Sequence, residues 1–165
     1  MHLLDGISRR LNQAMKFLAG FLIAAMTILV FLQVVFRYLL DAPLDWSEEM
    51  ASFAFVWMAL LGASVGLKND DHPGLDIFYQ IFPDWAKKLC GIIINLAILF
   101  MLVVLFIFGL KLTIAMQMQR TAALGYSISY VYAVLPLSAI IMFIHVSVKF
   151  VLLIANSKAE EIKSP

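Results

Sequence analysis

Four long apolar segments separated by short polar stretches dominate the pattern along the chain. They cover approximately residues 17–38, 46–67, 88–111 and 129–154. A helix of about 20 residues crosses the roughly 30 Å of hydrocarbon in a bilayer, whereas a membrane β-strand needs only about 9–11 residues of alternating polarity. None of the four segments alternates in that way. The pattern therefore predicts an all-α membrane protein, with four transmembrane helices in a single membrane domain over residues 1–165.

Two shorter segments are predicted to lie along the membrane interface as amphipathic helices. In residues 2–16, apolar side chains recur at helical spacing opposite charged ones. An equally good interpretation is that this segment extends the first span. Residues 75–86 mix aromatic and charged side chains, and Pro83 would kink a helix there.

The distribution of Lys and Arg predicts the orientation in the membrane. One side of the predicted topology carries nine of the twelve basic residues: Arg9, Arg10, Lys16, Lys68, Lys87, Lys88, Lys149, Lys158 and Lys163. The other side has only Arg37, Lys111 and Arg120. Because basic loops stay in the cytoplasm, both termini are predicted to be cytoplasmic.

The composition agrees with a membrane protein and excludes several function classes. Hydrophobic residues make up 63% and charged residues 14% of the chain, against about 45–50% and 25% in soluble domains. A formal charge of +1 does not suit a nucleic-acid binder, and a single cysteine excludes an intrachain disulfide. No phosphate loop, metalloprotease motif or nucleophile elbow is present, so no enzyme, cofactor or metal site is predicted.

Polar side chains gather at the ends of the spans. Arg37 closes the first span, and Trp46, Glu48 and Glu49 open the second, so a short hairpin brings them to one membrane depth. Two interpretations stay open. The residues form a local ion pair with acids that complement the helix dipole, or they form a docking surface for a partner on the outer side.

The second and fourth spans contain candidate packing residues. Gly62 and Gly66 form a small-residue stripe that allows a close helix contact, and packing within this chain is the favoured alternative. Trp57 lies too deep for the interfacial belt unless it packs against a helix. Pro136 should kink the outer half of the fourth span, and a lone His145 is read as a hydrogen-bonded packing residue.

Several blocks of residues form a recognisable pattern along most of the chain. In the first half they are residues 33–38 (QVVFRY), Pro43, residues 46–49 (WSEE), Trp57 and residues 61–63 (LGA). In the second half they are His72 and Asp76 at His-x-x-x-Asp spacing, Thr121, residues 124–125, Tyr132 and residues 135–137. Together they resemble the small membrane subunit of tripartite ATP-independent periplasmic (TRAP) transporters, the DctQ-type family. Pro73, Gly74 and Ser138 depart from the family pattern.

The resemblance implies a role in an uptake system of the bacterial inner membrane. It implies a stable heterodimer with a large membrane subunit, transient contact with a periplasmic binding protein, and sodium sites in the large subunit. An organic acid such as sialic acid or a C4-dicarboxylate is the implied substrate, with sialic acid favoured. The alternatives are a cytochrome b-like anchor of a respiratory dehydrogenase, which would need paired axial histidines, and an independent four-helix exchanger, which would need an acid deep in the membrane.

The chain's own candidate residues are therefore structural or interfacial. They are Arg37, Trp46, Glu48, Glu49, Trp57, Gly62, Gly66, His72, Asp76, Arg120 and Pro136.

Overall fold

A computed structural model describes residues 2–69 and 84–161. Its helices are α1 (His2–Leu39), α2 (Asp45–Asn69), α4 (Asp84–Ala115), the 3₁₀ turn η1 (Met116–Met118), α5 (Ser129–Tyr132) and α6 (Val134–Glu161). Four stretches are long and apolar enough to cross a membrane: Ser8–Leu39, Asp45–Asn69, Leu89–Met118 and Ser129–Val151. The predicted all-α architecture with four spans is confirmed.

The two predicted interfacial segments have different outcomes. Residues 2–16 form the first turns of α1, in one continuous helix with the first span, which matches the alternative of an extended span. Most of the segment 75–86 lies outside the described residues, and its last three residues begin α4. His72 and Asp76 also lie outside the described residues.

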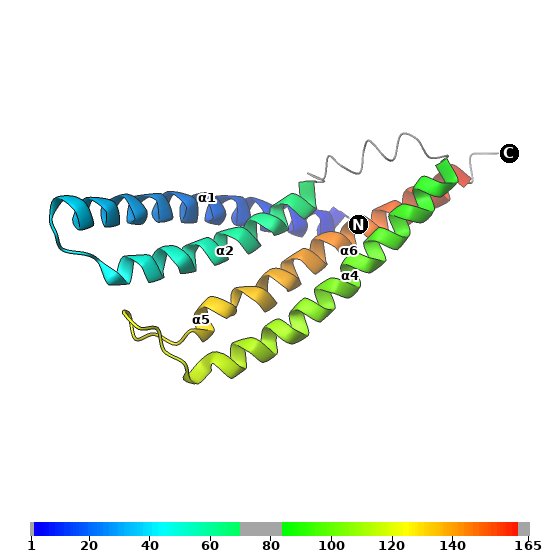
Figure 1. The fold of residues 1–165 in the computed structure, drawn as a ribbon. Coiled ribbons are helices and arrows are strands. Elements are labelled where there is room, and N and C mark those ends of the chain that lie inside the picture. The colour runs from blue at the N-terminus through cyan, green and yellow to red at the C-terminus, as the bar shows by residue number, and fades with distance from the viewer. Residues whose placement is uncertain (1, 70–83, 162–165) are drawn as a thin grey trace.

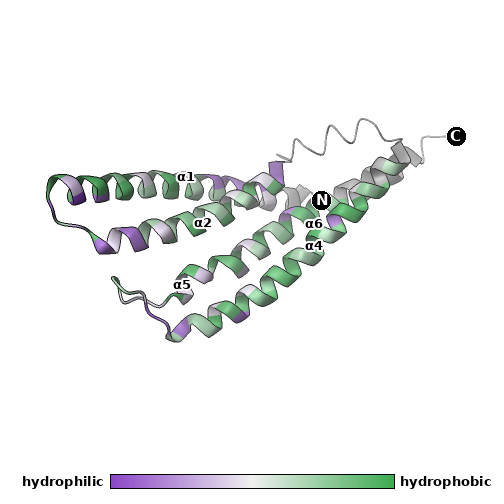
Figure 2. Cartoon of the chain, in the orientation of Figure 1, coloured by the Kyte–Doolittle hydropathy of each residue, from purple (hydrophilic) through white to green (hydrophobic). Residues whose placement is uncertain are grey.

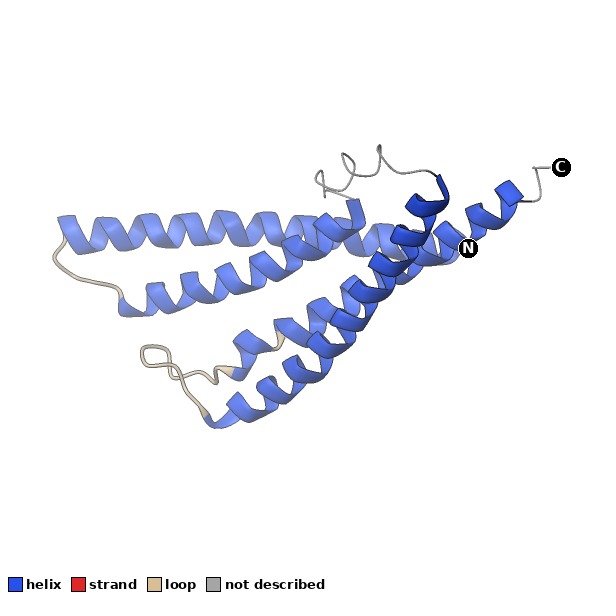
Figure 3. Ribbon diagram, turned by 45° about the vertical axis from the view of Figure 1, so that its right-hand side comes forward, coloured by secondary structure: helices blue, strands red, loops and turns tan. Residues whose placement is uncertain are grey.

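The long helices form two antiparallel hairpins that converge at one end (Figure 1). We call this the terminal end, because α1 begins and α6 finishes there. At the opposite, distal end the hairpins α1–α2 and α4–α6 diverge, and Figure 3 shows the same divergence from another angle. Both ends of the described chain therefore lie on one side of the membrane, as the even number of spans requires.

The helices are arranged as an open row in the order α1, α2, α6, α4. The packing of α2 against α6 joins the hairpins, and α1 also touches α6. The last span is the most buried of the four. In its most apolar 18-residue stretch, 50% of the residues are buried, compared with 17% in the second and third spans and none in the first. The helices are mostly hydrophobic along their length (Figure 2), and many of their large apolar side chains are exposed, as the lipid-facing side of a membrane protein requires.

Two small clusters of buried side chains hold the row together. Leu61, Val134 and Ile141 join α2 to α6, and residues of α1 pack against them. Leu102, Met142 and Val146 join α4 to α6. Helix α6 contributes to both clusters, so it is the central helix of the fold.

The last span is interrupted near its distal end at Ala133, between α5 and α6. Pro136 lacks the N–H group that would bond to the Tyr132 carbonyl, which explains a loosened turn at this point. Ala133 nevertheless keeps helical dihedral angles, with φ −58° and ψ −23°. Pro136 thus disturbs the hydrogen-bonding pattern of the outer part of this span without reversing the chain.

Candidate functional site

A hydrogen-bonded loop of residues 119–128 connects η1 to α5 at the distal end. The peptide N–H of Thr121 donates to the Tyr126 carbonyl at 2.9 Å, and that of Ile128 donates to the Gln119 carbonyl at 3.0 Å. Gly125 has a φ of +69°, a conformation that glycine adopts without strain. The loop is therefore a compact turn with its own hydrogen bonds.

Glu49 attaches this loop to the second span. Its two carboxylate oxygens accept the peptide N–H groups of Ala123 at 2.8 Å and Leu124 at 3.0 Å. Thr121 is buried beside the same carboxylate. Because the acceptor is charged and both oxygens are used, the contact fixes the position and the orientation of the loop relative to α2.

Arg120 stabilises the same loop from within. Its Nη1 donates to the Gly125 carbonyl at 3.0 Å, while the rest of its side chain is exposed. Ser127 adds a bond from its hydroxyl to the Gln117 carbonyl at 2.9 Å. The candidates Glu49 and Arg120, 71 positions apart in the sequence, thus act on one structure.

The other candidates of the predicted hairpin do not join this contact. Arg37 lies exposed in the last turn of α1, and Glu48 is exposed in the first turn of α2. The Trp46 side chain is 43% exposed. The two oxygens of Glu49 accept from residues 123–124 and not from Arg37, so Glu49 links α2 to the loop of residues 119–128 instead of closing its own hairpin.

Trp57 lies beneath the loop. It packs against the cluster around Leu61 and lines a groove of about 210 Å³ between α2 and the loop. Leu124 and Tyr126 from the loop line the same groove. The position of these two side chains therefore depends on the attachment by Glu49.

The close helix contact expected at Gly62 and Gly66 is found elsewhere. Apart from the chain neighbours and the nearby backbone of the same helix, no described atom lies within 4 Å of a Cβ built on either glycine. A Cβ on Gly109 of α4, in contrast, would lie 2.8 Å from the Leu135 Cβ and 3.3 Å from the Pro136 Cδ. Gly109 does not stand out in the sequence, because Thr113, and not a second glycine, follows it four positions later.

A separate polar cluster lies at the terminal end. Ser8 Oγ and His145 Nδ1 are hydrogen bonded at 2.8 Å, and both side chains are almost fully buried. Asn12 Nδ2 donates to Asn69 Oδ1 at 3.2 Å. These bonds join α1 to α6 and to α2, so His145 acts as a packing residue among the described helices.

Comparison with known proteins identifies the family. Residues 26–156 match the family model described as "Tripartite ATP-independent periplasmic transporters, DctQ component". This match includes residues 26–39 of α1 and the whole of α2 and α4.

Curated relatives agree with the family model. The C4-dicarboxylate TRAP transporter small permease protein DctQ of Vibrio cholerae is 40% identical over 78 residues, which are 47% of this chain and 34% of that protein. The sialic acid TRAP transporter permease protein SiaT of Haemophilus influenzae is 30% identical over 133 residues, 80% of this chain and 21% of that protein. A putative TRAP transporter small permease protein of Haemophilus influenzae is 28% identical over 137 residues, 83% of each chain.

The chain thus spans about a third of the length of the Vibrio cholerae DctQ protein and about a fifth of the SiaT protein. It spans most of the putative small permease protein. The family is a transporter component and not an enzyme family. With its four apolar helices, the chain therefore belongs to the DctQ-component family of tripartite ATP-independent periplasmic transporters, as a multi-pass small permease subunit of the bacterial inner membrane.

Proposed function

We propose that this chain forms a stable heterodimer with a large permease subunit and supports it in the membrane. Two longer relatives support this pairing: the chain matches 21% of the SiaT permease protein and 20% of the isethionate TRAP transporter permease protein DctMQ. In each, a segment like this chain is part of a much longer permease polypeptide. Two proteins that work as one complex are often joined in this way.

The distribution of charge supports a scaffolding role. Residues 17–36, 50–67, 89–110 and 128–148 contain no Asp, Glu, Lys or Arg. Ion and substrate pathways within membranes are normally marked by such residues. We therefore assign the transport pathway and the sodium sites to the large subunit.

The proposed cargo is an organic acid, such as sialic acid or a C4-dicarboxylate, taken up with sodium ions. The names of the relatives support this substrate class, since they include C4-dicarboxylate, sialic acid and isethionate transporters. Cells that produce this chain, the large subunit and the binding protein together should accumulate labelled substrate only with a sodium gradient. Uptake by this chain alone, or uptake that ignores sodium, would contradict the proposal.

We propose that the loop of residues 119–128, at the distal end, helps to dock the periplasmic binding protein. The observation that carries this proposal is the attachment of residues 123–124 to Glu49, which holds the loop in one conformation. The neighbouring side chains of Tyr126 and Tyr130 are 61% and 71% exposed. A loop that is ordered before binding loses less entropy when a partner docks, and tyrosine is enriched at protein interfaces.

Glu49→Gln tests this role, and Glu48→Gln is the matched control. In Glu49→Gln, the amide nitrogen replaces one acceptor and meets a peptide N–H donor, so the loop loses one attachment. We expect the concentration of binding protein for half-maximal uptake to rise severalfold, while the large subunit still co-purifies. Glu48→Gln should leave both unchanged. Equal behaviour of the two variants would refute a docking role for the loop.

A further inference from the structure

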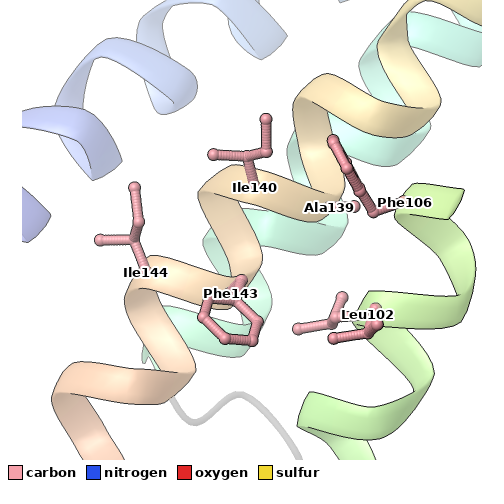
Figure 4. A pocket seen from close by; sticks show the side chains of 7 residues that line it. Leu102, Phe106, Ala139, Ile140, Phe143 and Ile144 are labelled. Carbon is pink, nitrogen blue, oxygen red and sulfur yellow. The ribbon is translucent and has the colours of Figure 1, made fainter. Parts of the chain in front are cut away.

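An apolar groove runs between the two helices of the second hairpin, α4 and α6 (Figure 4). Its volume is about 240 Å³. It is lined by Leu102, Val103 and Phe106 from α4, and by Ala139, Ile140, Phe143 and Ile144 from α6. An apolar cavity of about 150 Å³ is large enough to hold benzene, so this groove can accept a large side chain.

The groove lies on the central helix of the row. Helix α6 packs against α1, α2 and α4, yet it still exposes an apolar stripe at a spacing of three residues. Leu137, Ile140 and Phe143 in this stripe are 43%, 47% and 42% exposed. A helix that already packs against three other long helices therefore has one more side that no described residue covers.

The total exposed surface leaves room for a large interface. The chain exposes 11411 Å². A compact soluble monomer of the same mass exposes roughly 8,200 Å², so the whole chain exposes roughly 3,200 Å² more. Obligate complexes bury about 2,000–5,000 Å² in total, or about half of that on each partner. One such interface fits within the additional surface.

The occupant of the groove should be another membrane helix of defined shape. Within lipid, burying apolar surface gives no hydrophobic gain between helices, so association depends on close packing. A concave groove with aromatic and branched walls allows such packing, because a protruding side chain makes contacts on several sides. The fused relatives indicate a large permease partner in the same membrane.

We propose that the α4–α6 groove receives bulky apolar side chains from a transmembrane helix of the large permease subunit. This assignment rests on the proposed function and deepens it, since it identifies the face of the small subunit that the partner covers.

Photo-crosslinking in intact membranes tests the assignment. The photoreactive amino acid p-benzoylphenylalanine replaces Phe143 in the groove, in cells that also produce the large subunit. The control is the same replacement of Phe108, which is 63% exposed on α4 and lies two residues, about 200° of helical rotation, from the groove residue Phe106. We expect a covalent adduct with the large subunit from position 143, at several times the yield from position 108.

A second variant fills the groove without a photochemical step. Ile140→Trp adds bulk to its wall, and overpacking should reduce the amount of large subunit that co-purifies by about tenfold or more. Phe108→Trp should stay within about twofold of the unmodified chain. Because Phe108 belongs to the same hairpin, this variant controls for general effects of an added tryptophan.

The outcomes separate the groove from the proposed function. If the large subunit co-purifies but position 143 reacts only with lipid, or no more than position 108, the groove is not the interface. Normal co-purification of Ile140→Trp would also overturn it. If the unmodified chain does not co-purify with the large subunit and position 143 gives no adduct with it, the heterodimer itself is refuted.

Discussion

Gly109 offers the sharpest test of the packing between α4 and α6. A Cβ at this position would lie 2.8 Å from the Leu135 Cβ, which is too close to the backbone for a rotamer change to relieve. Carbon atoms pack best at about 3.5–4.0 Å, so the two helices must separate locally by roughly 0.7 Å. Overpacking of this kind costs about 1–3 kcal/mol. Gly109→Ala should therefore destabilise the chain by about that amount.

Gly66→Ala is the matched control, because no described atom beyond its chain neighbours and the nearby backbone of its own helix lies within 4 Å of a Cβ there. Alanine favours helix formation over glycine by about 1 kcal/mol in water. In lipid, however, helices stay formed even when they separate, because their backbone groups have no other partners, and most of that gain cancels. The control should therefore stay within about 0.5 kcal/mol of the unmodified chain.

Reversible unfolding of the purified subunit in mixed micelles, titrated with denaturing detergent and followed by tryptophan fluorescence, measures both variants. A change of about 1.4 kcal/mol corresponds to a tenfold change in the unfolding equilibrium constant. If Gly109→Ala proves as stable as Gly66→Ala, the close approach of α4 to the Leu135–Pro136 turn does not exist, and the argument from Gly109 fails.

Three further predictions concern the core, the polar cluster and the topology. Leu61→Ala empties a fully buried site and should cost about 2–5 kcal/mol in the same unfolding assay, whereas Phe21→Ala, 60% exposed, should have little effect. Ser8→Ala should lower the free energy of unfolding by about 0.6 kcal/mol, and by about 1.7 kcal/mol at most, because it removes the bond to His145. The cost of Ser8→Ala and His145→Ala together should differ from the sum of the two single costs, and a cost equal to that sum would show that the bond contributes nothing. A reporter fused to the C-terminus should be active in the cytoplasm, and periplasmic activity would overturn the orientation from basic residues.

The arrangement of four spans follows from the sequence alone, for a simple physical reason. Within a bilayer, a long apolar segment must satisfy its own backbone hydrogen bonds, and a helix is the only single-segment structure that does so. The length and hydropathy of each segment therefore determine its structure without reference to the rest of the chain. The family pattern was equally visible, because the blocks around Arg37, Trp46 and Trp57 lie within local stretches of sequence.

Contacts between distant segments could not be predicted in this way. The sequence suggests that Glu49 belongs with Arg37 in its own hairpin, whereas its carboxylate bonds to residues 123–124, more than 70 positions away. Likewise, Gly62 and Gly66 form the recognisable stripe, but the close helix contact is at Gly109. Which side chains meet depends on the rotation and order of the helices.

That order was decided by the tertiary structure. Apolar segments of similar hydropathy can pack in many ways, because lipid solvates them all equally well, and only shape and a few polar contacts distinguish the alternatives. Here the clusters around Leu61 and Leu102, with the bond between Ser8 and His145, place α6 in the centre of an open row. The sequence by itself determined that the chain crosses the membrane four times; the packing decided which faces remain uncovered.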